Sequence, residues 1–395
     1  MNRIYLDNSA TTRTDDRVID DMILFMREGY GNPSSLHSFG REANRAVQEA
    51  RQRVAGLIGA QPDEIIFTSG GTESDNLALK GYALANGRKG GHIITSSIEH
   101  HAVLEPCRYL EKIGFEVTFL PVDEFGMIST ASVEEAIRKD TVLISIMHAN
   151  NEIGTVQPID AIAKLANEKG VPFHTDAVQT VGRIPLDVSN GISMLSMSGH
   201  KFHGPKGVGA LFVRKGIRLE TQMHGGGQEK GVRSSTENVP AIVGMGKAAE
   251  IAGEEFDAES RRQVRIRDMI IDGVLESVPR SFLNGHRSER LPNNAHFRFD
   301  FIEGEGIVLH LDMRGIAVST GSACSTSSLE PSHVLLATGL MPHQAHGSLR
   351  ISLGRFNTEE EARIFLDNIS EVVSILREMS PYNENNPIAP GGDQC

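Results

Sequence analysis

Short runs of apolar and β-branched residues alternate, over the first half of the chain, with longer segments whose apolar residues recur every three or four positions. The short runs predict buried strands, and the longer segments predict amphipathic helices. The expected strands are Glu64–Thr68, His92–Ser96, Glu116–Leu120, Val142–Met147, Pro172–Thr175, Met194–Met197 and Gly209–Val213. The expected helices are Asn76–Ala85, Val103–Ile113, Val133–Arg138 and Ile159–Lys169. This alternation is typical of an α/β fold, a mainly parallel sheet covered by helices.

The pattern changes beyond about residue 258. A helix rich in small residues, Ala241–Ala252, is followed by the charged stretch Glu254–Arg267, after which strand-like and helical segments are mixed. The later segments are His296–Phe301, Ile307–Arg314, Gly347–Leu353 and the helix Thr358–Arg377. Because 395 residues exceed one typical core, we expect a large domain over 15–258 and a smaller α+β domain formed by 1–14 and 259–380. The tail 381–395, full of Asn, Pro and Gly, is expected to be disordered.

Composition and charge narrow the functional classes. The chain has 39 Lys and Arg against 51 Asp and Glu, a formal net charge of −12, and no basic run, which argues against a nucleic-acid partner. No stretch approaches the roughly 18 apolar residues that span a membrane, so we expect no membrane contact. Only three cysteines occur, at scattered spacings, which argues against a disulfide framework or a zinc site. A reducing cytoplasm fits this composition best.

The segment Ser198–Gly207 carries the strongest local signal for chemistry. It places Lys201 just after a predicted strand, flanked by small residues and by serine and histidine donors. This combination suits an aldehyde cofactor that carries a phosphate: Lys201 would form an imine, while Ser198 and His200 would hold phosphate oxygens. The alternative interpretation is a glycine-rich surface turn with a solvated lysine.

A second segment, His174–Gln179, places Asp176 just past a predicted buried strand, where ligand groups gather in open α/β sheets. A carboxylate at that point can pair with a pyridinium nitrogen and keep the ring protonated, so that the ring accepts electrons. Gln179 could donate a hydrogen bond to the phenolic oxygen of such a ring. The alternative is that Asp176 is only the N-cap of a helix.

Three further strand ends offer complementary groups. The run Thr68–Ser74 opens a helix after a strand, and the free amides of Gly71 and Thr72 would cradle a phosphate. His100 follows another strand and could stack on a flat aromatic ring, although a lone histidine is more often structural. The motif Asn150–Gly154 follows a third strand and offers amide donors. Five strand ends therefore predict one site for an aromatic phosphate cofactor.

Each of the three cysteines requires its own explanation. Cys324 lies in Ser319–Ser328, a run with little apolar content to pack and much Ser and Gly. A thiol on such a loop could move between a buried substrate and an outside acceptor, or it could be an unreactive cysteine in a turn of small residues. Cys107, inside a predicted helix, is expected to be a core thiol. Cys395 ends the tail and receives no role.

Arg350 lies in the apolar, strand-like run Gly347–Leu353. An arginine buried there requires a planar anion, and the carboxylate of an amino acid would fit its fork of donors. The alternative is an internal salt bridge.

Several of these segments together match a known family. The motifs are Gly31-Asn-Pro-Ser-Ser-Leu-His, Thr68-Ser-Gly-Gly-Thr-Glu-Ser, Asn150-Asn-Glu-Ile-Gly, Ser198-Gly-His-Lys and Gly321-Ser-Ala-Cys. On these motifs the chain resembles the cysteine desulfurases of the NifS/IscS kind, pyridoxal 5'-phosphate (PLP) enzymes of the aspartate-aminotransferase fold. The likeness runs from Tyr5 to Glu361 and so covers all but the tail. It implies a fold type I enzyme, with a mainly parallel seven-stranded sheet in the large domain, that converts L-cysteine to L-alanine.

The resemblance assigns roles residue by residue where the motifs match. Lys201 resembles the lysine that forms the Schiff base, and Cys324 resembles the cysteine that receives the sulfur as a persulfide. Asp176 would lie at the pyridine nitrogen, and His100 would stack on the ring and move protons on the thiols. Asn32 and Arg350 resemble the groups that hold the substrate carboxylate. The remaining cofactor contacts implied are Gly71, Thr72, Asn151, Gln179, Ser198, Gly199 and His200.

The resemblance also implies partners. Thr236 resembles a threonine that reaches the phosphate of the neighbouring subunit, which implies a homodimer; the family often has Gly-Thr where this chain has Ser235-Thr236. The Ser- and Thr-rich run resembles the class with a mobile cysteine. In some complexes of the family the loop cysteine also ligates a nascent [2Fe–2S] cluster on a scaffold protein. The resemblance therefore extends to Cys324 as a transient metal ligand and to a scaffold of the IscU/NifU kind as sulfur acceptor.

Three other functions stay open on the sequence alone. A selenocysteine lyase would use the same residues and prefer selenium. A plain PLP aminotransferase would not need Cys324. A catalytically silent subunit that scaffolds iron–sulfur assembly would need neither the lysine nor the cysteine, and the presence of Lys201, Asp176 and Cys324 argues against it.

Overall fold

Seven strands between residues 65 and 213 form the main sheet of the computed structural model, which describes residues 3–87, 90–321 and 330–383. The strands are β2 (Ile65–Thr68), β3 (His92–Ser96), β4 (Glu116–Leu120), β5 (Thr141–Ser145), β6 (Phe173–Asp176), β7 (Met194–Ser198) and β8 (Gly209–Val213). Their order is β2-β8-β7-β6-β5-β3-β4, and only β8 runs antiparallel to its neighbours. The predicted seven-stranded, mainly parallel sheet is confirmed.

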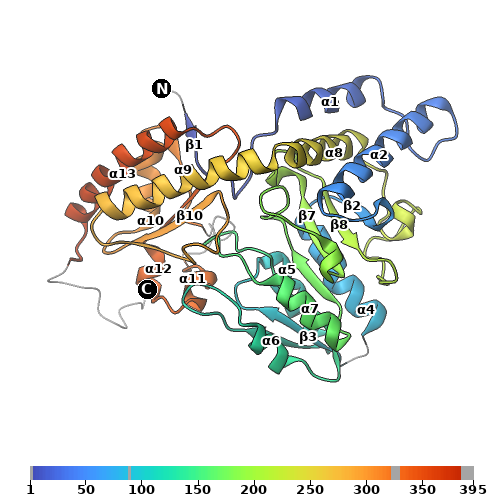
Figure 1. Ribbon diagram of the computed structural model, residues 1–395, viewed down its shortest axis with the longest axis horizontal. Coiled ribbons are helices and arrows are strands. Elements are labelled where there is room, and N and C mark those ends of the chain that lie inside the picture. The colour runs from blue at the N-terminus through green and yellow to red at the C-terminus, as the bar shows by residue number, and fades with distance from the viewer. Residues whose placement is uncertain (1–2, 88–89, 322–329, 384–395) are drawn as a thin grey trace.

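Helices cover both faces of this sheet (Figure 1). Because successive residues of a strand point to opposite faces, Ile65 and Phe67 pack on one side while Ile66 packs on the other. The first face is covered by α1 (Asp16–Arg27), α2 (Ser38–Leu57), α6 (Thr130–Ala136), α7 (Ile159–Lys169) and α8 (Val239–Glu254). The second is covered by η2 (Leu77–Gly81), α4 (Tyr82–Asn86) and α5 (His101–Lys112). Burial of both faces explains why these strands read as continuous apolar runs.

The helix predicted over Asn76–Ala85 begins earlier than expected. α3 (Gly71–Asn76), the π-helical turn η2 and α4 follow one another without a break in helical backbone angles. The first turns consist of small and polar residues, so they carry no apolar periodicity from which the start could be recognised. The consequence is that α3 starts directly at the end of β2, at the edge of the sheet where the strand ends meet.

A second, smaller region is built around two sheets. β1 (Ile4–Tyr5) pairs with β11 (Ile316–Ala317), and β9 (Ser281–Leu283), β10 (Asn294–Phe299) and β12 (Ser348–Ser352) form an antiparallel sheet in the order β12-β10-β9. α9 (Phe256–Ser277), α10 (Gly304–Asp312) and α13 (Glu359–Met379) pack on it, and α11 (His333–Ala337) and α12 (Pro342–His346) lie beside it. The predicted α+β character of this region agrees with these elements.

The chain start belongs to the hydrophobic core of the small region. Ile4 and Leu6 share that core with Ile266 and Phe297, whereas the large sheet has cores of its own. Figure 1 shows α9 running on from α8 to cross over to the small sheet. The expected domain boundaries at residues 14 and 258 stay a prediction. In the described ranges, no helix is long and apolar enough to cross a membrane.

Candidate active site

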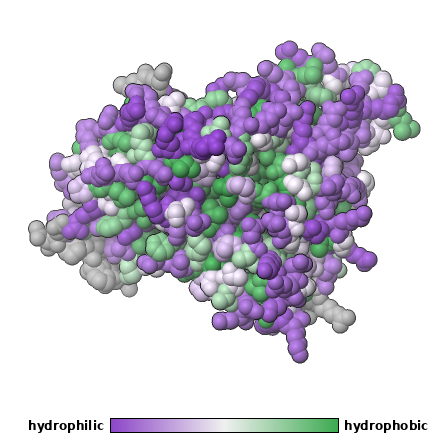
Figure 2. Space-filling model, viewed as in Figure 1, coloured by the Kyte–Doolittle hydropathy of each residue, from purple (hydrophilic) through white to green (hydrophobic). Residues whose placement is uncertain are grey.

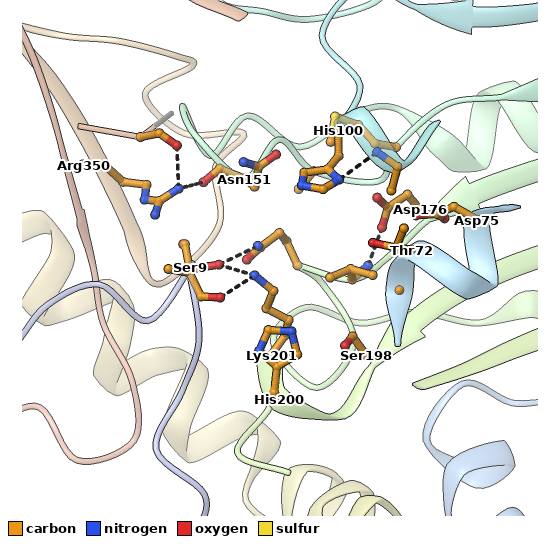
Figure 3. Close-up of a pocket in the computed structure, with 18 residues that line it drawn as sticks. Ser9, Thr72, Asp75, His100, Asn151, Asp176, Ser198, His200, Lys201 and Arg350 are labelled. Carbon is orange, nitrogen blue, oxygen red and sulfur yellow. Dashed lines mark hydrogen bonds between the residues drawn. The ribbon is translucent and has the colours of Figure 1, made fainter. Parts of the chain in front are cut away.

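A cavity of about 380 Å³ lies where the carboxyl ends of the large-sheet strands face the small region. This is the position at which ligands bind in open α/β sheets. Its wall contains most of the residues singled out from the sequence (Figure 3). The predicted residues in the wall are Gly71, Thr72, His100, Asn151, Asp176, Gln179, Ser198, His200, Lys201 and Arg350.

Lys201 projects into the cavity from the short turn that ends β7. Its Nζ donates to the backbone carbonyls of Ser9 at 2.5 Å and Ala10 at 2.9 Å. The carbonyl of Lys201 itself accepts a hydrogen bond from the buried Arg183 at 2.5 Å. The lysine is therefore held at both its backbone and its tip, and it is not the solvated surface lysine of the alternative interpretation.

Asp176 is the last residue of β6, and it is 7% exposed. Its Oδ1 accepts a hydrogen bond from the amide of Val178 at 2.9 Å, which is an Asx-type turn. Burial raises the pKa of Asp176 to about 6, while the Val178 amide and the charge of Lys201 oppose that rise. A cationic partner inside the cavity would return this carboxyl to its ionised form.

The turn between β2 and α3 approaches Ser198 closely. Gly70 has φ +157°, and a Cβ on Gly71 would come within 2.7 Å of Val178 Cγ2, so a side chain at residue 71 would not fit. Gly71 and Thr72 open the helix, where amide N–H groups lack intrahelical acceptors. The neighbouring His200 bonds Thr11 Oγ1 through Nδ1 at 3.0 Å. These groups together offer neutral donors to an anion.

Both cavity histidines are neutral at neutral pH. Burial, with a smaller contribution from Lys201, lowers the pKa of His100 to about 4 and that of His200 to about 4. His100 caps α5, and its Nδ1 accepts from the amide of Ala102 at 3.1 Å. Because Nδ1 is an acceptor, the proton of the neutral ring lies on Nε2.

Arg350 lies on β12 and forms the small-sheet side of the wall. Its Nη2 bonds Asp7 Oδ1 at 2.7 Å, and its Nη1 donates to the carbonyls of Asn151 and Gly321 at 3.1 Å each. The internal salt bridge considered as the alternative is thus present. Among the described residues Nε has no hydrogen-bond partner, so one donor of the fork stays available to a ligand.

Three of the predicted site residues that the structure describes do not line the cavity, and a fourth is not described. Asn32 lies between α1 and α2, Thr236 lies before α8, and the amide of Gly199 is bonded to the carbonyl of Val208 at 3.0 Å. Cys324 lies outside the described residues, as does Cys395. Gly321, three positions before Cys324, does line the cavity.

Cys107 is fully buried in the core between the large sheet and α5, and burial raises the pKa of its thiol strongly. The prediction of a core thiol is confirmed. Within the described ranges, no group of three or more His, Cys, Asp or Glu side chains is placed to hold a metal ion.

The sequence pattern did not identify several residues of the wall. Ser9 and Ala10 act through backbone carbonyls, which carry no sequence signal. Asp75 lies on α3 and is 1% exposed. The sequence feature that could have identified Asp75 is its position four residues after Gly71, on the helix that begins at the predicted phosphate cradle. The other unpredicted members are small or apolar: Ala102, Met147, Ala149, Val178 and Gly321.

The residues present fit an aromatic cofactor with a phosphate group. The wall combines a tethered lysine, a buried carboxyl and a glycine turn with neutral donors. Two buried polar atoms of residues in this wall, Ser9 Oγ and Asp75 Oδ1, have no hydrogen-bond partner within the described part of the chain. Buried polar atoms without partners are uncommon in folded proteins, and such atoms are expected where a polar ligand belongs.

Comparisons with known proteins agree with this geometry. Residues 4–365 match the family model described as aminotransferase class-V. A cysteine desulfurase IscS of Dictyoglomus turgidum is 55% identical over 96% of this chain and 97% of its own length. The IscS of Methanosarcina thermophila is 54% identical over 96% of this chain and 94% of its own.

Solved structures are similar as well. A NifS-like protein has a TM-score of 0.89 and 43% identity, covering 95% of this chain and all of its own. A structure described as SspA in complex with cysteine has a TM-score of 0.80 and 41% identity, covering 90% of this chain and all of its own.

Proposed function

The chain belongs to the class-V aminotransferase family, and we propose that it is a PLP-dependent cysteine desulfurase that converts L-cysteine to L-alanine. The observation that carries this conclusion is a single cavity lined by both Lys201, at the end of β7, and Asp176, at the end of β6. Relatives that are more than half identical over nearly the whole chain carry the same name. Turns rather than a helix follow Asp176, so it does not act as a helix cap.

We propose that Lys201 holds PLP covalently and that Asp176 faces its ring nitrogen. Ser198, His200, Gly71 and Thr72 would receive the phosphate, with Gln179 and Asn151 at the ring. When bound, PLP supplies a protonated ring that accepts electrons from the Cα carbon of the amino acid. The raised pKa of Asp176 supports this pairing, because a buried carboxyl gains most from a cationic partner.

Lys201 is the base that we assign to the Cα proton. The carbonyls of Ser9 and Ala10 orient its amine inside the cavity, and the neutral form of that amine would accept the proton. His100 is proposed to assist proton movement at the thiols, and in its neutral form the Nε2–H group is suited to donate a hydrogen bond to a thiolate.

The sulfur step is assigned to Cys324. Its thiolate attacks the sulfur of L-cysteine, an S–S bond forms, the C–S bond breaks, and the products are L-alanine and a persulfide on the enzyme. Gly321 in the cavity wall supports this assignment, because it precedes Cys324 by three residues. Arg350, whose Nε has no hydrogen-bond partner among the described residues, is proposed to hold the substrate carboxylate.

A homodimer would account for the residues outside the wall. Asn32 and Thr236 do not line the cavity of their own chain, and a second copy offers each a cavity to reach. The corner between α1 and α2 exposes large apolar side chains, with Leu36 91% and Tyr30 70% exposed. Figure 2 shows hydrophobic surface there among hydrophilic residues. Apolar surface of this kind supports an interface between copies.

The acceptors of the sulfur follow from the same proposal. A persulfide must pass to another thiol, so we propose a scaffold protein of the IscU/NifU kind for iron–sulfur assembly, together with other sulfur acceptors. Cys324 as a transient ligand of a [2Fe–2S] cluster on that scaffold is part of this proposal. The reducing cytoplasm is the proposed compartment, because the chemistry requires a free thiol.

Incubation with L-cysteine followed by two measurements tests the function. Alanine should form, and mass spectrometry should find one added sulfur atom on the peptide that contains Cys324. The peptides of Cys107 and Cys395 are internal controls and should stay unmodified. Neither alanine nor added sulfur would overturn the proposal. A much faster reaction with selenocysteine than with cysteine would favour a selenocysteine lyase instead.

A further inference from the structure

Three buried carboxyl groups lie together on the large-sheet side of the cavity, and two of them belong to its wall. Asp75 on α3 is 1% exposed, Glu99 after β3 is fully buried, and Asp176 at the end of β6 is 7% exposed. The charge of Asp176 raises the pKa of both Asp75 and Glu99, and the charge of Glu99 raises that of Asp75. Among the described residues, no lysine or arginine forms an ion pair with Asp75 or Glu99. In such surroundings the three groups cannot all be ionised.

The hydrogen bonds distinguish the three groups. Glu99 accepts from Ser96 Oγ at 2.6 Å and from the amide of Met147 at 2.9 and 3.1 Å. Asp176 accepts from the amide of Val178 at 2.9 Å. Asp75 is bonded through Ser196 alone, and its Oδ1, which lies 3.6 Å from His174 Nε2, has no hydrogen-bond partner in the part of the chain that the structure describes. Of the three carboxyl groups, Asp75 therefore has the fewest hydrogen-bond donors to stabilise a negative charge.

His174 is the nearest ring to Asp75, but it does not provide a counter-charge. Its Nε2 lies 3.6 Å from Asp75 Oδ1 and 3.0 Å from Ser196 Oγ, and its Nδ1 bonds Ser145 Oγ at 2.8 Å. Burial lowers the pKa of His174 to about 3, so the ring is neutral. The pair of Asp75 and His174 is therefore not a salt bridge at neutral pH.

We propose that Asp75 is a positioning residue that stays a neutral carboxylic acid, so that Asp176 is the ionised carboxylate of the pair. The inference rests on the proposed function, because it is the cofactor's ring nitrogen that Asp176 would face. An ionised Asp75 would place a second negative charge behind Asp176 and disfavour ionisation of Asp176. A neutral Asp75 leaves the single negative charge on the carboxyl that faces the cavity.

The surroundings of Asp75 agree with a protonated group. Desolvation is the largest cause that raises the pKa of Asp75, and the charges of Asp176 and Glu99 add to it, while the bond from Ser196 opposes it. His174 is the other titratable group close to Asp75, and Lys201 acts on Asp176 from the far side. Burial raises the pKa of Glu99 to about 8, so Glu99 must be separated from Asp75 experimentally.

Thermal unfolding of the PLP-free protein at different pH values tests the inference without any catalysis. The unfolded pKa of an aspartate is about 3.9, and the folded pKa of Asp75 lies well above it. The stability that the proton contributes is therefore complete below about pH 4 and is lost as the pH rises through the folded pKa. Asp75→Asn keeps a neutral group and removes that loss.

The expected result is a difference between two pH values. The melting temperature of Asp75→Asn relative to wild type should be higher at pH 9 than at pH 5 by about 2 °C or more. Asp20→Asn, at an exposed position on α1, is the matched control and should show no such difference. An equal shift at both pH values, or a larger destabilisation at pH 9, would overturn the inference.

Glu99→Gln separates the contribution of Glu99 to the pH dependence of stability from that of Asp75. The same variant tests the inference if Asp75→Asn does not fold. With Glu99 removed, part of the alkaline loss of stability should persist, and its complete disappearance would contradict a proton on Asp75.

With PLP added at pH 7, Asp176→Asn should weaken retention of PLP by at least about tenfold, the effect of one charge-assisted hydrogen bond. Asp75→Asn should lose less, and an equal loss would contradict the inference. Absence of alanine formation in wild type would refute the proposed function and leave the unfolding result standing.

Discussion

The wall of the cavity on the large sheet and the wall on the small sheet use their polar groups differently. On the large sheet, burial lowers the pKa values of His100 and His200, so both rings are neutral. Burial also raises the pKa of Asp176 to about 6. On the small sheet, the Arg350 guanidinium pairs with Asp7 and donates to backbone carbonyls. Under the proposed function, the first wall would move protons and electrons, and the second would hold an anion close to Gly321.

Removing Lys201 should break the function of the large-sheet wall completely. Lys201→Ala deletes both the tether and the base, so the absorbance of bound cofactor should be lost and alanine formation should fall by about four orders of magnitude or more. Lys206→Ala, an exposed lysine in the same segment, is the control and should retain both. Normal turnover by Lys201→Ala would remove this residue from the mechanism.

Cys324→Ser should stop the sulfur step and leave the large-sheet wall intact. A serine hydroxyl does not ionise near neutral pH, so the variant should bind PLP and change its spectrum with L-cysteine, yet form alanine several orders of magnitude more slowly. Cys107→Ser and Cys395→Ser are the matched controls. Equal alanine yields from wild type and Cys324→Ser, without added dithiothreitol, would contradict a persulfide on this residue.

Arg350→Lys should sharpen the comparison by changing the small-sheet wall alone. Lysine keeps the positive charge but loses the planar fork, so the KM for L-cysteine should rise by about tenfold or more, while the absorbance of bound cofactor stays the same. Asp7→Asn is the companion variant, because it breaks the internal salt bridge from the other side. If both variants lost only thermal stability, Arg350 would be a structural residue.

The smallest effect is expected at Thr236. Loss of one hydrogen bond to the phosphate of a second copy corresponds to about 1 kcal/mol, so Thr236→Ala should weaken PLP retention roughly fivefold. Ser235→Ala is the control at the neighbouring position. PLP retained after dialysis and the mass in solution by light scattering are the measurements. A monomer with full activity would contradict both the role of Thr236 and the dimer.

The strands of the large sheet were predictable because their signal is local. All seven lie within two residues of their expected bounds, and all but the edge strand β4 are largely buried. The helices α1 and α2 were not predicted, although α2 packs directly against α8. α2 presents mainly alanines to that contact, and small residues give only weak periodicity.

The sequence by itself determined which chemical groups stand at the ends of the strands. Lys201, Asp176, His100 and the Gly71 turn each follow a strand directly, so strand prediction alone brings them to one edge of the sheet. The tertiary structure decided how those groups are held and charged. The hydrogen bond between Lys201 and the carbonyl of Ser9 joins residues 192 positions apart in the sequence. The bond between Arg350 and Asp7 joins residues 343 positions apart. Such contacts, and the burial that shifts the pKa of Asp75, depend on how distant segments pack, whereas hydrophobic periodicity reports only what neighbours in the chain share.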